Sequence, residues 1–361
     1  MKNEIKILML LAVTALMFTA CSEDDDIPPA PSEPAVAYIV NYGSYSGDKS
    51  TITAFDKETG NVTHSYYENA NGVAMVSNVQ HAYSYNGNVY FMGNNSDQVF
   101  WVDSKSFLQT ENAITTDIVK PRYAVAEGKY LYVSCWGGDI WEDENLSYIA
   151  EINTVTNTVE NTLALPGGPE GMAIANNKLY VALNYKDSVA VLELGTTTFN
   201  YIETPAVSSY FIKDNSDNLY VSLVSTYSDY SEDTGLGYIN TTNDELEATY
   251  ALDGVSTSYV NILASNNDFS KLYVMTSAYD AEWNLSGAVS VFDVASKTFQ
   301  SDNLVEGVSG LNGIGYYNDQ LFTFVSESVT GNGKAVVYNT DGTEDTNFKT
   351  GISPFMLLTA E

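Results

Sequence analysis

Short runs of alternating apolar and polar residues recur along the chain, and they predict β-strands. The clearest run is Lys178–Leu183, followed by a loop and then by Ser188–Leu194. Apolar side chains at every second position are typical of a strand that buries one face. The first half of this run recurs around seven aromatic residues: Tyr38, Tyr90, Tyr132, Tyr180, Tyr220, Tyr273 and Phe322. Neighbouring members of this set are 40 to 53 residues apart, a period that is typical of the blades of a β-propeller.

The repeat around Tyr180 predicts a blade of four antiparallel strands. Asn, Gly and Asp residues between the apolar runs are typical of the turns that join short strands. The four predicted strands are Glu170–Ala175, Lys178–Leu183, Ser188–Leu194 and Thr198–Glu203. No segment after residue 35 has helical periodicity over ten or more residues, so the predicted class is all-β. We expect the seven aromatic residues to be buried between blades, where each contributes roughly 2–3 kcal/mol.

The two ends of the repeat array are predicted to form one blade together. The N-terminal repeat has no inner strand, and its three predicted strands are Val36–Asn41, Ser50–Asp56 and Asn61–Tyr67. Ser353–Leu358 has the pattern of an inner strand but belongs to no complete repeat. Pairing this segment with Val36–Asn41 completes a seventh blade and removes the exposed edges of an open array. The sequence therefore predicts a seven-bladed β-propeller over residues 36–361, closed by its C-terminal strand.

The first 35 residues are predicted to lie outside the propeller. Lys2 and Lys6 precede an apolar run, Ile7–Phe18, that is too short to span a bilayer and ends in Thr19-Ala20-Cys21. This arrangement resembles a bacterial lipoprotein signal peptide over residues 1–20, with Cys21 as the lipidated first residue. Residues 21–35 are acidic and proline-rich, which predicts an extended tether. The acidic run after Cys21 resembles the surface-export signal of Bacteroidetes lipoproteins, which implies a lipid-anchored, surface-exposed location at the outer membrane.

The charge of the chain argues against nucleic acid as a partner. Loss of residues 1–20 removes Lys2, Lys6 and Glu4, leaving 13 basic and 45 acidic residues and a net charge of −32. Such a surface repels phosphate backbones. Apart from Cys21, Cys135 is the one cysteine of the mature chain, so no intrachain disulfide is available. We expect Cys135 to be a small buried residue.

The loops between the second and third strands of each blade are the candidate binding region. In a propeller these loops open on one face around the central channel, and here they hold three of the four tryptophans of the chain. Solvent-facing rings among Asp, Asn, Ser and Gly are typical of a recognition surface, although some rings are expected only to pack the loops. The candidate ligand-binding residues in these loops are Tyr42, Tyr45, Trp136, Trp141, Tyr185, Tyr227, Tyr230, Tyr279 and Trp283.

The starts of the inner strands are expected to line the mouth of the channel. Arg122, a tenth candidate, either holds an acidic group of a ligand or neutralises Glu170 from the next blade. His64 is expected in an outer strand, whereas His81 either faces the channel or forms structural hydrogen bonds. The sequence has no zinc-spaced cluster, nucleophile elbow or phosphate-binding glycine loop, and it predicts no cofactor and no metal.

The N-terminal half carries a resemblance to a known family. It lies in Asn41-Tyr42-Gly43, Lys120-Pro121-Arg122-Tyr123, Tyr132–Trp136 and Gly168–Met172, and it is strongest over residues 38–183. In this order the motifs resemble the YncE-like seven-bladed propellers of Bacteroidetes surface lipoproteins. That group includes BtuG-type proteins, which capture cobalamin and pass it to a TonB-dependent outer-membrane transporter. The resemblance implies a cobalamin or corrinoid ligand and a transporter of this class as partner.

Two classes of function remain open. The first is capture of a bulky nutrient at the loop face, with a corrinoid as the leading ligand and a glycan as the alternative, because Tyr and Trp also stack on sugars. The second is an enzyme, for example a lactonase-like or hydrolytic propeller with a metal in the channel. An enzyme requires polar groups that converge at the inner-strand starts, and the available ones are His81, Glu170, Asn261 and Asn312. Binding is the favoured class.

Overall fold

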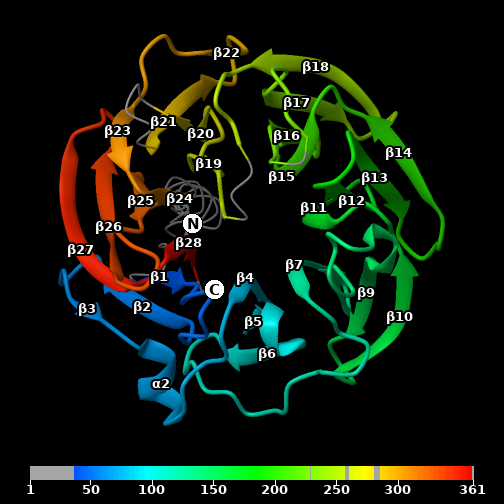
Figure 1. Cartoon of the computed structure of the whole chain (residues 1–361), viewed down its shortest axis with the longest axis horizontal. Coiled ribbons are helices and arrows are strands. Elements are labelled where there is room, and N and C mark those ends of the chain that lie inside the picture. Colours follow the sequence, from blue (N-terminus) through cyan, green and yellow to red (C-terminus); the bar gives the residue numbers. More distant parts are fainter. Residues whose placement is uncertain (1–35, 228, 257–259, 280–284, 360–361) are drawn as a thin grey trace, which may run out of the picture. The chain divides into compact units, whose positions relative to one another are not determined.

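Strands make up nearly all the regular structure in the computed structural model, which describes residues 36–227, 229–256, 260–279 and 285–359. One compact unit spans Pro34–Glu361. Its strands form seven antiparallel sheets among the described residues, and Figure 1 shows these sheets arranged around a common centre. The all-β class and the seven-bladed propeller are therefore confirmed. Cys21 and the segments predicted as signal peptide and tether lie outside the described residues, so these assignments stay predictions.

The blades are numbered here in chain order from β4. Blade 1 contains β4 (Val79–Tyr85), β5 (Asn88–Gly93) and β6 (Gln98–Asp103). Blade 2 contains β7 (Pro121–Glu127), β8 (Tyr130–Cys135), β9 (Tyr148–Asn153) and β10 (Thr158–Ala164). Blade 3 contains β11 (Pro169–Ala175), β12 (Lys178–Leu183), β13 (Ser188–Glu193) and β14 (Phe199–Glu203). Blade 4 contains β15 (Val207–Lys213), β16 (Leu219–Val224), β17 (Gly235–Asn240) and β18 (Glu245–Ala251).

The remaining three blades include one with five strands, blade 5, and one built from both ends of the chain, blade 7. Blade 5 contains β19 (Leu263–Ser265), β20 (Lys271–Tyr279), β21 (Leu285–Asp293), β22 (Thr298–Phe299) and β23 (Val305–Ser309), and both β22 and β23 pair with β21. Blade 6 contains β24 (Leu311–Tyr317), β25 (Gln320–Val325), β26 (Asn332–Asn339) and β27 (Glu344–Ile352). Blade 7 contains β28 (Pro354–Leu358), β1 (Val36–Asn41), β2 (Thr51–Asp56) and β3 (Val62–Thr63).

Blade 7 joins the two ends of the array as the sequence predicts. β28 runs antiparallel to β1, with Tyr38 opposite Leu358 and Val40 opposite Met356. The ladder continues beyond the strands, since the Tyr42 amide donates to the Ser353 carbonyl at 2.9 Å. The closing strand of the ring is thus the last strand of the chain.

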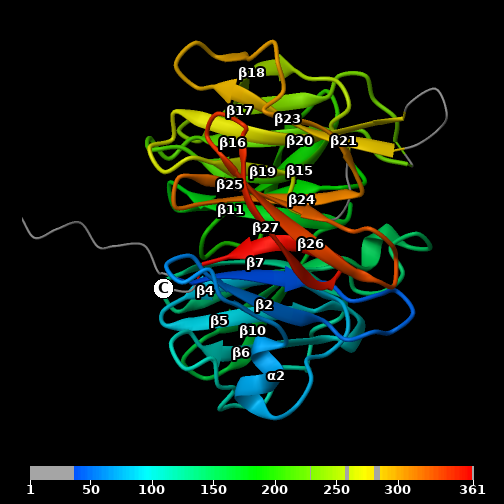
Figure 2. The ribbon, with the colours of Figure 1, turned by 90° about the vertical axis from the view of Figure 1, so that its left-hand side faces the viewer.

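The outer edges of blades 7 and 1 differ from the prediction. The expected strand Asn61–Tyr67 is only two residues long, Val62–Thr63, and a helix, α2 (Tyr66–Asn71), follows it. His64 consequently lies between β3 and α2, and not in an outer strand. Figures 1 and 2 place α2 at the outside of the ring beside blades 7 and 1. Blade 1 has three strands. At the outer edge, where the other blades have a fourth strand, it has only an isolated antiparallel bridge between Val99 and Ile114.

Aromatic packing explains why these two edges are irregular. Tyr66 of the helix packs 5.1 Å from Phe107, which in turn stacks 4.9 Å from Tyr38. Tyr67 packs 6.0 Å from Phe100 and is 3% exposed. Burial of these rings stabilises the path of the chain away from the sheet.

The repeated aromatic residues form the core of the blades. All seven members of the set that contains Tyr38 and Phe322 are buried, with exposed fractions of 7% or less. The prediction of a packing role is confirmed for each of them. Cys135 at the end of β8 is also fully buried, as expected.

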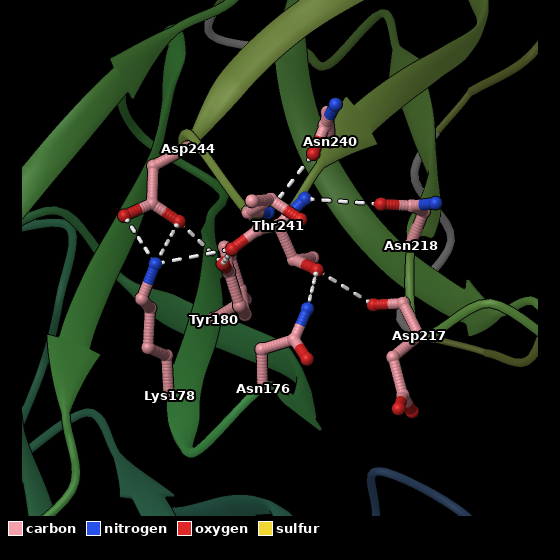
Figure 3. A network of polar contacts seen from close by, with 9 residues as sticks. Asn176, Lys178, Tyr180, Asp217, Asn218, Asn240, Thr241 and Asp244 are labelled. Carbon is pink, nitrogen blue, oxygen red and sulfur yellow. Dashed lines mark hydrogen bonds and ion pairs between the residues drawn. The ribbon is translucent and has the colours of Figure 1, made fainter.

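Blades 3 and 4 are held together by a polar network (Figure 3). The Lys178 ammonium contacts both carboxylate oxygens of Asp244, at 2.9 and 2.8 Å, and the Thr241 carbonyl at 3.0 Å. The Tyr180 hydroxyl donates to Asp244 Oδ1 at 2.5 Å, and Asn176 donates to the Thr241 hydroxyl. Side chains of β12 and of the turn before it thereby bind the turn between β17 and β18 of the next blade.

Candidate functional site

Irregular starts of the inner strands aim polar side chains at the centre of the ring. The pairing of β4 with β5 shifts between Val79 and Ala82, and that of β7 with β8 shifts between Pro121 and Tyr123. The pairing of β11 with β12 shifts between Pro169 and Met172. A bulge leaves the extra residues unpaired and redirects their side chains. The residues displaced in this way include Gln80, His81, Arg122 and Glu170.

A pocket of about 360 Å³ lies where the loops after β1, β5 and β8 meet. Its aromatic lining is Tyr42, Tyr45, Trp136 and Trp141. Its polar lining is Gln80, Asn94, Asn95, Lys120, Arg122 and Asp139, and Gly138 completes the wall. Blades 7, 1 and 2 thus contribute to one cavity. This set of residues is called the aromatic pocket below.

Each aromatic wall of the pocket pairs a covered ring with an exposed one. Trp136 is 4% exposed and meets the 67%-exposed Trp141 edge to face, with ring centres 5.4 Å apart and an interplanar angle of 79°. Tyr42 is half-buried and lies 5.4 Å from the ring of Tyr45, which is 82% exposed. The covered ring fixes the position of its exposed neighbour. The pocket therefore presents two large, supported apolar surfaces to solvent.

Arg122, one of the lining residues, forms a buried ion pair with Glu170 that joins blades 2 and 3. Arg122 Nε donates to Glu170 Oε2 at 2.9 Å, and Arg122 Nη2 donates to Glu170 Oε1 at 2.8 Å. Arg122 Nη1 donates to Gln80 Oε1 at 3.0 Å. The expected neutralisation of Glu170 by Arg122 is confirmed, and contact of Arg122 with an acidic group of a ligand stays a prediction. Such two-point geometry is the strongest form of an ion pair between side chains.

Burial and charge act in opposite directions on this pair. Burial raises the pKa of the Glu170 carboxyl, and the Arg122 charge opposes that rise. Burial lowers the pKa of Arg122, but Glu170, Tyr210 and Tyr42 together outweigh this effect and the pKa is raised overall. A guanidinium stays protonated in proteins, and its two-point contact with Glu170 favours the ionised form of that carboxyl.

One corner of the pocket is a set of amides around Lys120. Asn94 Nδ2 donates to the Pro121 carbonyl at 3.1 Å, which fixes the amide against blade 2. Lys120 Nζ donates to Asn95 Oδ1 at 3.2 Å, and Asn95 Nδ2 donates to Asn78 Oδ1. The polar groups of this corner are held in place by the protein.

The centre of the ring is filled by side chains and leaves a cavity of about 50 Å³. His81 lies there with its ring centre 3.7 Å from that of Tyr123, and its Nδ1 accepts from the Ala124 amide at 3.3 Å. Burial lowers the pKa of His81 to about 3. The imidazole is therefore neutral, and since Nδ1 accepts, its proton is on Nε2.

Three of the four residues considered for an enzyme do converge on this cavity. His81, Glu170 and Asn261 line it together. Glu170 is engaged by Arg122, and Asn261 Nδ2 donates to the Ile314 carbonyl at 3.1 Å. Asn312 instead donates to the Pro354 carbonyl at 2.9 Å. Among the described residues, His, Cys, Asp and Glu side chains form no group of three or more that could hold a metal ion.

The candidate rings divide between the pocket and other places. Four candidate rings line the aromatic pocket: Tyr42, Tyr45, Trp136 and Trp141. The sequence predicted that Trp136 faces solvent, but it is buried. Its burial follows from the Arg122 guanidinium, whose carbon lies 4.0 Å from the ring centre. Tyr185 packs against Trp136 at 6.2 Å and does not line the pocket.

The remaining candidates lie elsewhere. Tyr227 is fully exposed, and Tyr230 lines a separate polar groove of about 760 Å³ beside Asp253 and Ser256. Trp283 and the side chain of Tyr279 lie outside the described residues.

The sequence did not single out Asn94, Asn95, Lys120 and Asp139 as lining residues. Asn94 and Asn95 lie in a loop between the second and third strands of a blade, as the selected rings do. Their position in such a loop was the signal that could have identified them. Lys120 and Asp139 are each two residues from a selected candidate, Arg122 and Trp141. Their place at the pocket depends on which loops the folded propeller brings together, and the sequence pattern does not show that.

Within the described part of the chain, the structure has no helix long and apolar enough to cross a bilayer.

No protein-family model and no curated protein sequence matches this chain. Solved structures do match it. A 6-phosphogluconolactonase-like protein from Bacteroides fragilis has a TM-score of 0.66 and 13% identity, covering 92% of this chain and 100% of that one. A quinonprotein alcohol dehydrogenase-like protein from Bacteroides thetaiotaomicron has a TM-score of 0.65 and 15% identity, covering 90% and 78%. AztD from Citrobacter koseri has a TM-score of 0.55 and 10% identity, covering 89% and 96%. At such identities these likenesses establish the propeller fold alone.

Proposed function

We propose that this chain is a binding protein that captures a bulky, ring-containing nutrient in the aromatic pocket, with cobalamin or another corrinoid as the leading ligand. The observation that carries the proposal is the pairing of an exposed ring with a covered one on each wall. Tyr45 and Trp141 offer large flat surfaces at a cavity whose polar groups are already held in place. Rigid rings with a few fixed polar groups are typical of small-molecule sites.

The proposal includes a location and a partner. The lipoprotein-like signal ending at Cys21 and the acidic run behind it support anchoring at the outer-membrane surface. A propeller held there by a tether can pass its ligand to a TonB-dependent transporter, as the resemblance to the BtuG type implies. The location is tested by labelling of Cys21 with a fatty-acid analogue in cells and by protease accessibility of the propeller.

A glycan is the second candidate ligand, and the size of the pocket favours it. A volume of about 360 Å³ is near the lower end of the ~300–1,000 Å³ range for ligand pockets, which suits one ring of a sugar chain. In a corrinoid complex the macrocycle would cover Tyr45 and Trp141, and only its amide arms would enter the pocket.

An enzyme has less support. Structural neighbours include lactonase-like and dehydrogenase-like propellers. In this chain, however, Glu170 and Asn261, the groups beside His81 in the central cavity, are bonded to other parts of the ring. Function belongs to a site and not to a fold, so the pocket with exposed rings is favoured.

Calorimetric titration of the purified protein with cyanocobalamin, followed by a panel of oligosaccharides, tests the proposal. We expect one-to-one binding that Trp141→Ala or Tyr45→Ala weakens by about tenfold or more, which is 1.4 kcal/mol. Tyr227→Ala is the control, because this ring is also exposed, even more than Tyr45 and Trp141, and lies outside the pocket. Binding that responds to Tyr227→Ala as strongly as to Trp141→Ala, or no binding of either ligand class, contradicts the proposal.

A further inference from the structure

The aromatic pocket has positive side chains, but their charges are balanced within the site. Its two cations are Arg122 and Lys120, and its one lining carboxylate is Asp139. Glu170 is not a lining residue, but it is bonded to Arg122 and is 1% exposed. These four groups sum to zero formal charge.

The contacts of Arg122 leave it little capacity to bind an anion. Three of its five N–H donors are engaged by side chains of the protein: the one on Nε and one on Nη2 by Glu170, and one on Nη1 by Gln80. One face of the guanidinium is covered by Trp136, and the whole side chain is 5% exposed. A ligand carboxylate would have to compete with a buried, bidentate partner that belongs to the protein.

The rest of the chain opposes anions further. Asn95 Oδ1 accepts one of the three N–H donors of the Lys120 ammonium, and the exposed Asp139 carboxylate at the same pocket offsets the Lys120 charge. The formal net charge of the whole chain is −31, which repels anionic ligands at long range. The available groups are apolar rings and amides, which suit a ligand that is polar and uncharged.

We propose that the aromatic pocket selects an uncharged ligand over an anionic one, and that Glu170 sets this selectivity by neutralising Arg122. This inference rests on the proposed function, because it specifies the class of ligand for the same pocket. Glu170 does not touch the ligand in this account and acts through Arg122 as a positioning residue.

The test uses pairs of probes that differ by one charge. One pair is cyanocobalamin and its derivative in which one side-chain amide is hydrolysed to a carboxylate. The other pair is a neutral oligosaccharide and the same chain with one sugar oxidised to a uronic acid. With wild-type protein we expect the neutral member of the binding pair to bind about tenfold or more tightly at neutral pH. Its affinity should be nearly constant between about 0.05 and 0.5 M NaCl.

Glu170→Gln is the decisive variant, because it leaves the charge of Arg122 without compensation. We expect the ratio of neutral to anionic affinity to fall by about tenfold or more. Structural damage alone would weaken both probes equally and leave the ratio unchanged. The double variant Arg122→Met with Glu170→Met removes both charges together, so it should keep the preference of the wild type and serves where Glu170→Gln does not fold.

The possible results distinguish failure of the charge-selectivity inference from failure of the proposed binding function. Equal or tighter binding of the anionic probe by wild-type protein overturns the inference and leaves capture of a ring-containing ligand intact. An unchanged ratio in Glu170→Gln, or loss of the preference in the double variant, also overturns it. Failure of both neutral probes to bind overturns the proposed function and the inference with it.

Discussion

The guanidinium carbon of Arg122 lies 4.0 Å above the centre of the Trp136 ring. Each residue was a separate candidate for ligand contact in the sequence, and the structure instead uses them together. Arg122 covers one face of Trp136 and is itself fixed by Glu170, while Trp136 supports Trp141. Trp136 therefore has a packing role and Trp141 a proposed ligand-binding role, and mutation of each residue can distinguish them.

Trp136→Ala should cost stability, and Trp141→Ala should cost only affinity. Trp136 is 4% exposed, and removal of a buried tryptophan typically costs about 3–5 kcal/mol. Trp141 is 67% exposed, so its removal should change the free energy of unfolding by about 0.5 kcal/mol or less. Urea unfolding followed by circular dichroism measures both. Equal destabilisation by the two variants would show that Trp141 is also a packing residue.

The contrast between these tryptophans shows what the sequence could predict. Strand periodicity and the spacing of the aromatic residues predicted the class, the blade number and the closing strand, because they reflect local pairing and burial. The pairing of Trp136 with Arg122 and Glu170 depends on bulges in β7 and β11, which leave no periodic signal. Likewise, helix α2 is too short to show a helical period, and it forms because Tyr66 and Tyr67 pack on blade 1 residues and on Phe107.

His81 should make the fold sensitive to mild acid. Its pKa is lowered from 6.5 to about 3 by burial, so between these values the unfolded chain binds a proton that the folded chain does not. The stability due to neutral His81 is therefore complete above pH 6.5 and is lost as the pH falls toward 3. The loss should reach about 2–3 kcal/mol near pH 4.5. The charged or titratable groups that share its cavity are Glu170, Tyr123 and Tyr210.

His81→Gln tests this pH dependence directly. The variant should lose less stability than the wild type between pH 7 and about pH 4.5, whatever its starting stability. His64→Gln is the matched control, since the chain has two histidines and His64 is exposed. Urea unfolding at a series of pH values gives the slopes. A wild-type slope that persists in His81→Gln would assign the acid sensitivity to other groups.

The ion pair between Lys178 and Asp244 should contribute measurably to stability (Figure 3). Its side chains are 23% and 29% exposed, and Asp244 also accepts from Tyr180. Lys178→Met should cost about 1.5–3 kcal/mol, because it removes charge-assisted bonds that join blade 3 to blade 4.

Lys213→Met provides the comparison for this variant. Lys213 and Asp217 form an ion pair at 3.0 Å within one blade, with side chains 46% and 53% exposed. Removal of such an exposed pair should cost about 0.5 kcal/mol or less. If Lys178→Met and Lys213→Met are equally stable in urea, the ion pair between blades 3 and 4 contributes no more to the free energy of unfolding than an exposed pair within one blade.

Removal of β28 should unfold the ring and not merely shorten it. A chain that ends at Ile352 lacks Phe355 and Leu358, which are 2% and 4% exposed, and it leaves β1 without its inner partner. Because each blade is stabilised by its neighbours, an open edge at blade 7 exposes the interfaces with blades 6 and 1 as well. We expect the truncated chain to lose its cooperative thermal transition, whereas a chain that ends at Thr359 keeps it. Addition of a peptide that spans residues 353–361 should restore the transition in proportion to its concentration. A truncated chain that unfolds cooperatively at the wild-type temperature, with no response to the peptide, would mean that β28 is dispensable. The ring would then be closed by packing between blade 6 and the remaining strands of blade 7.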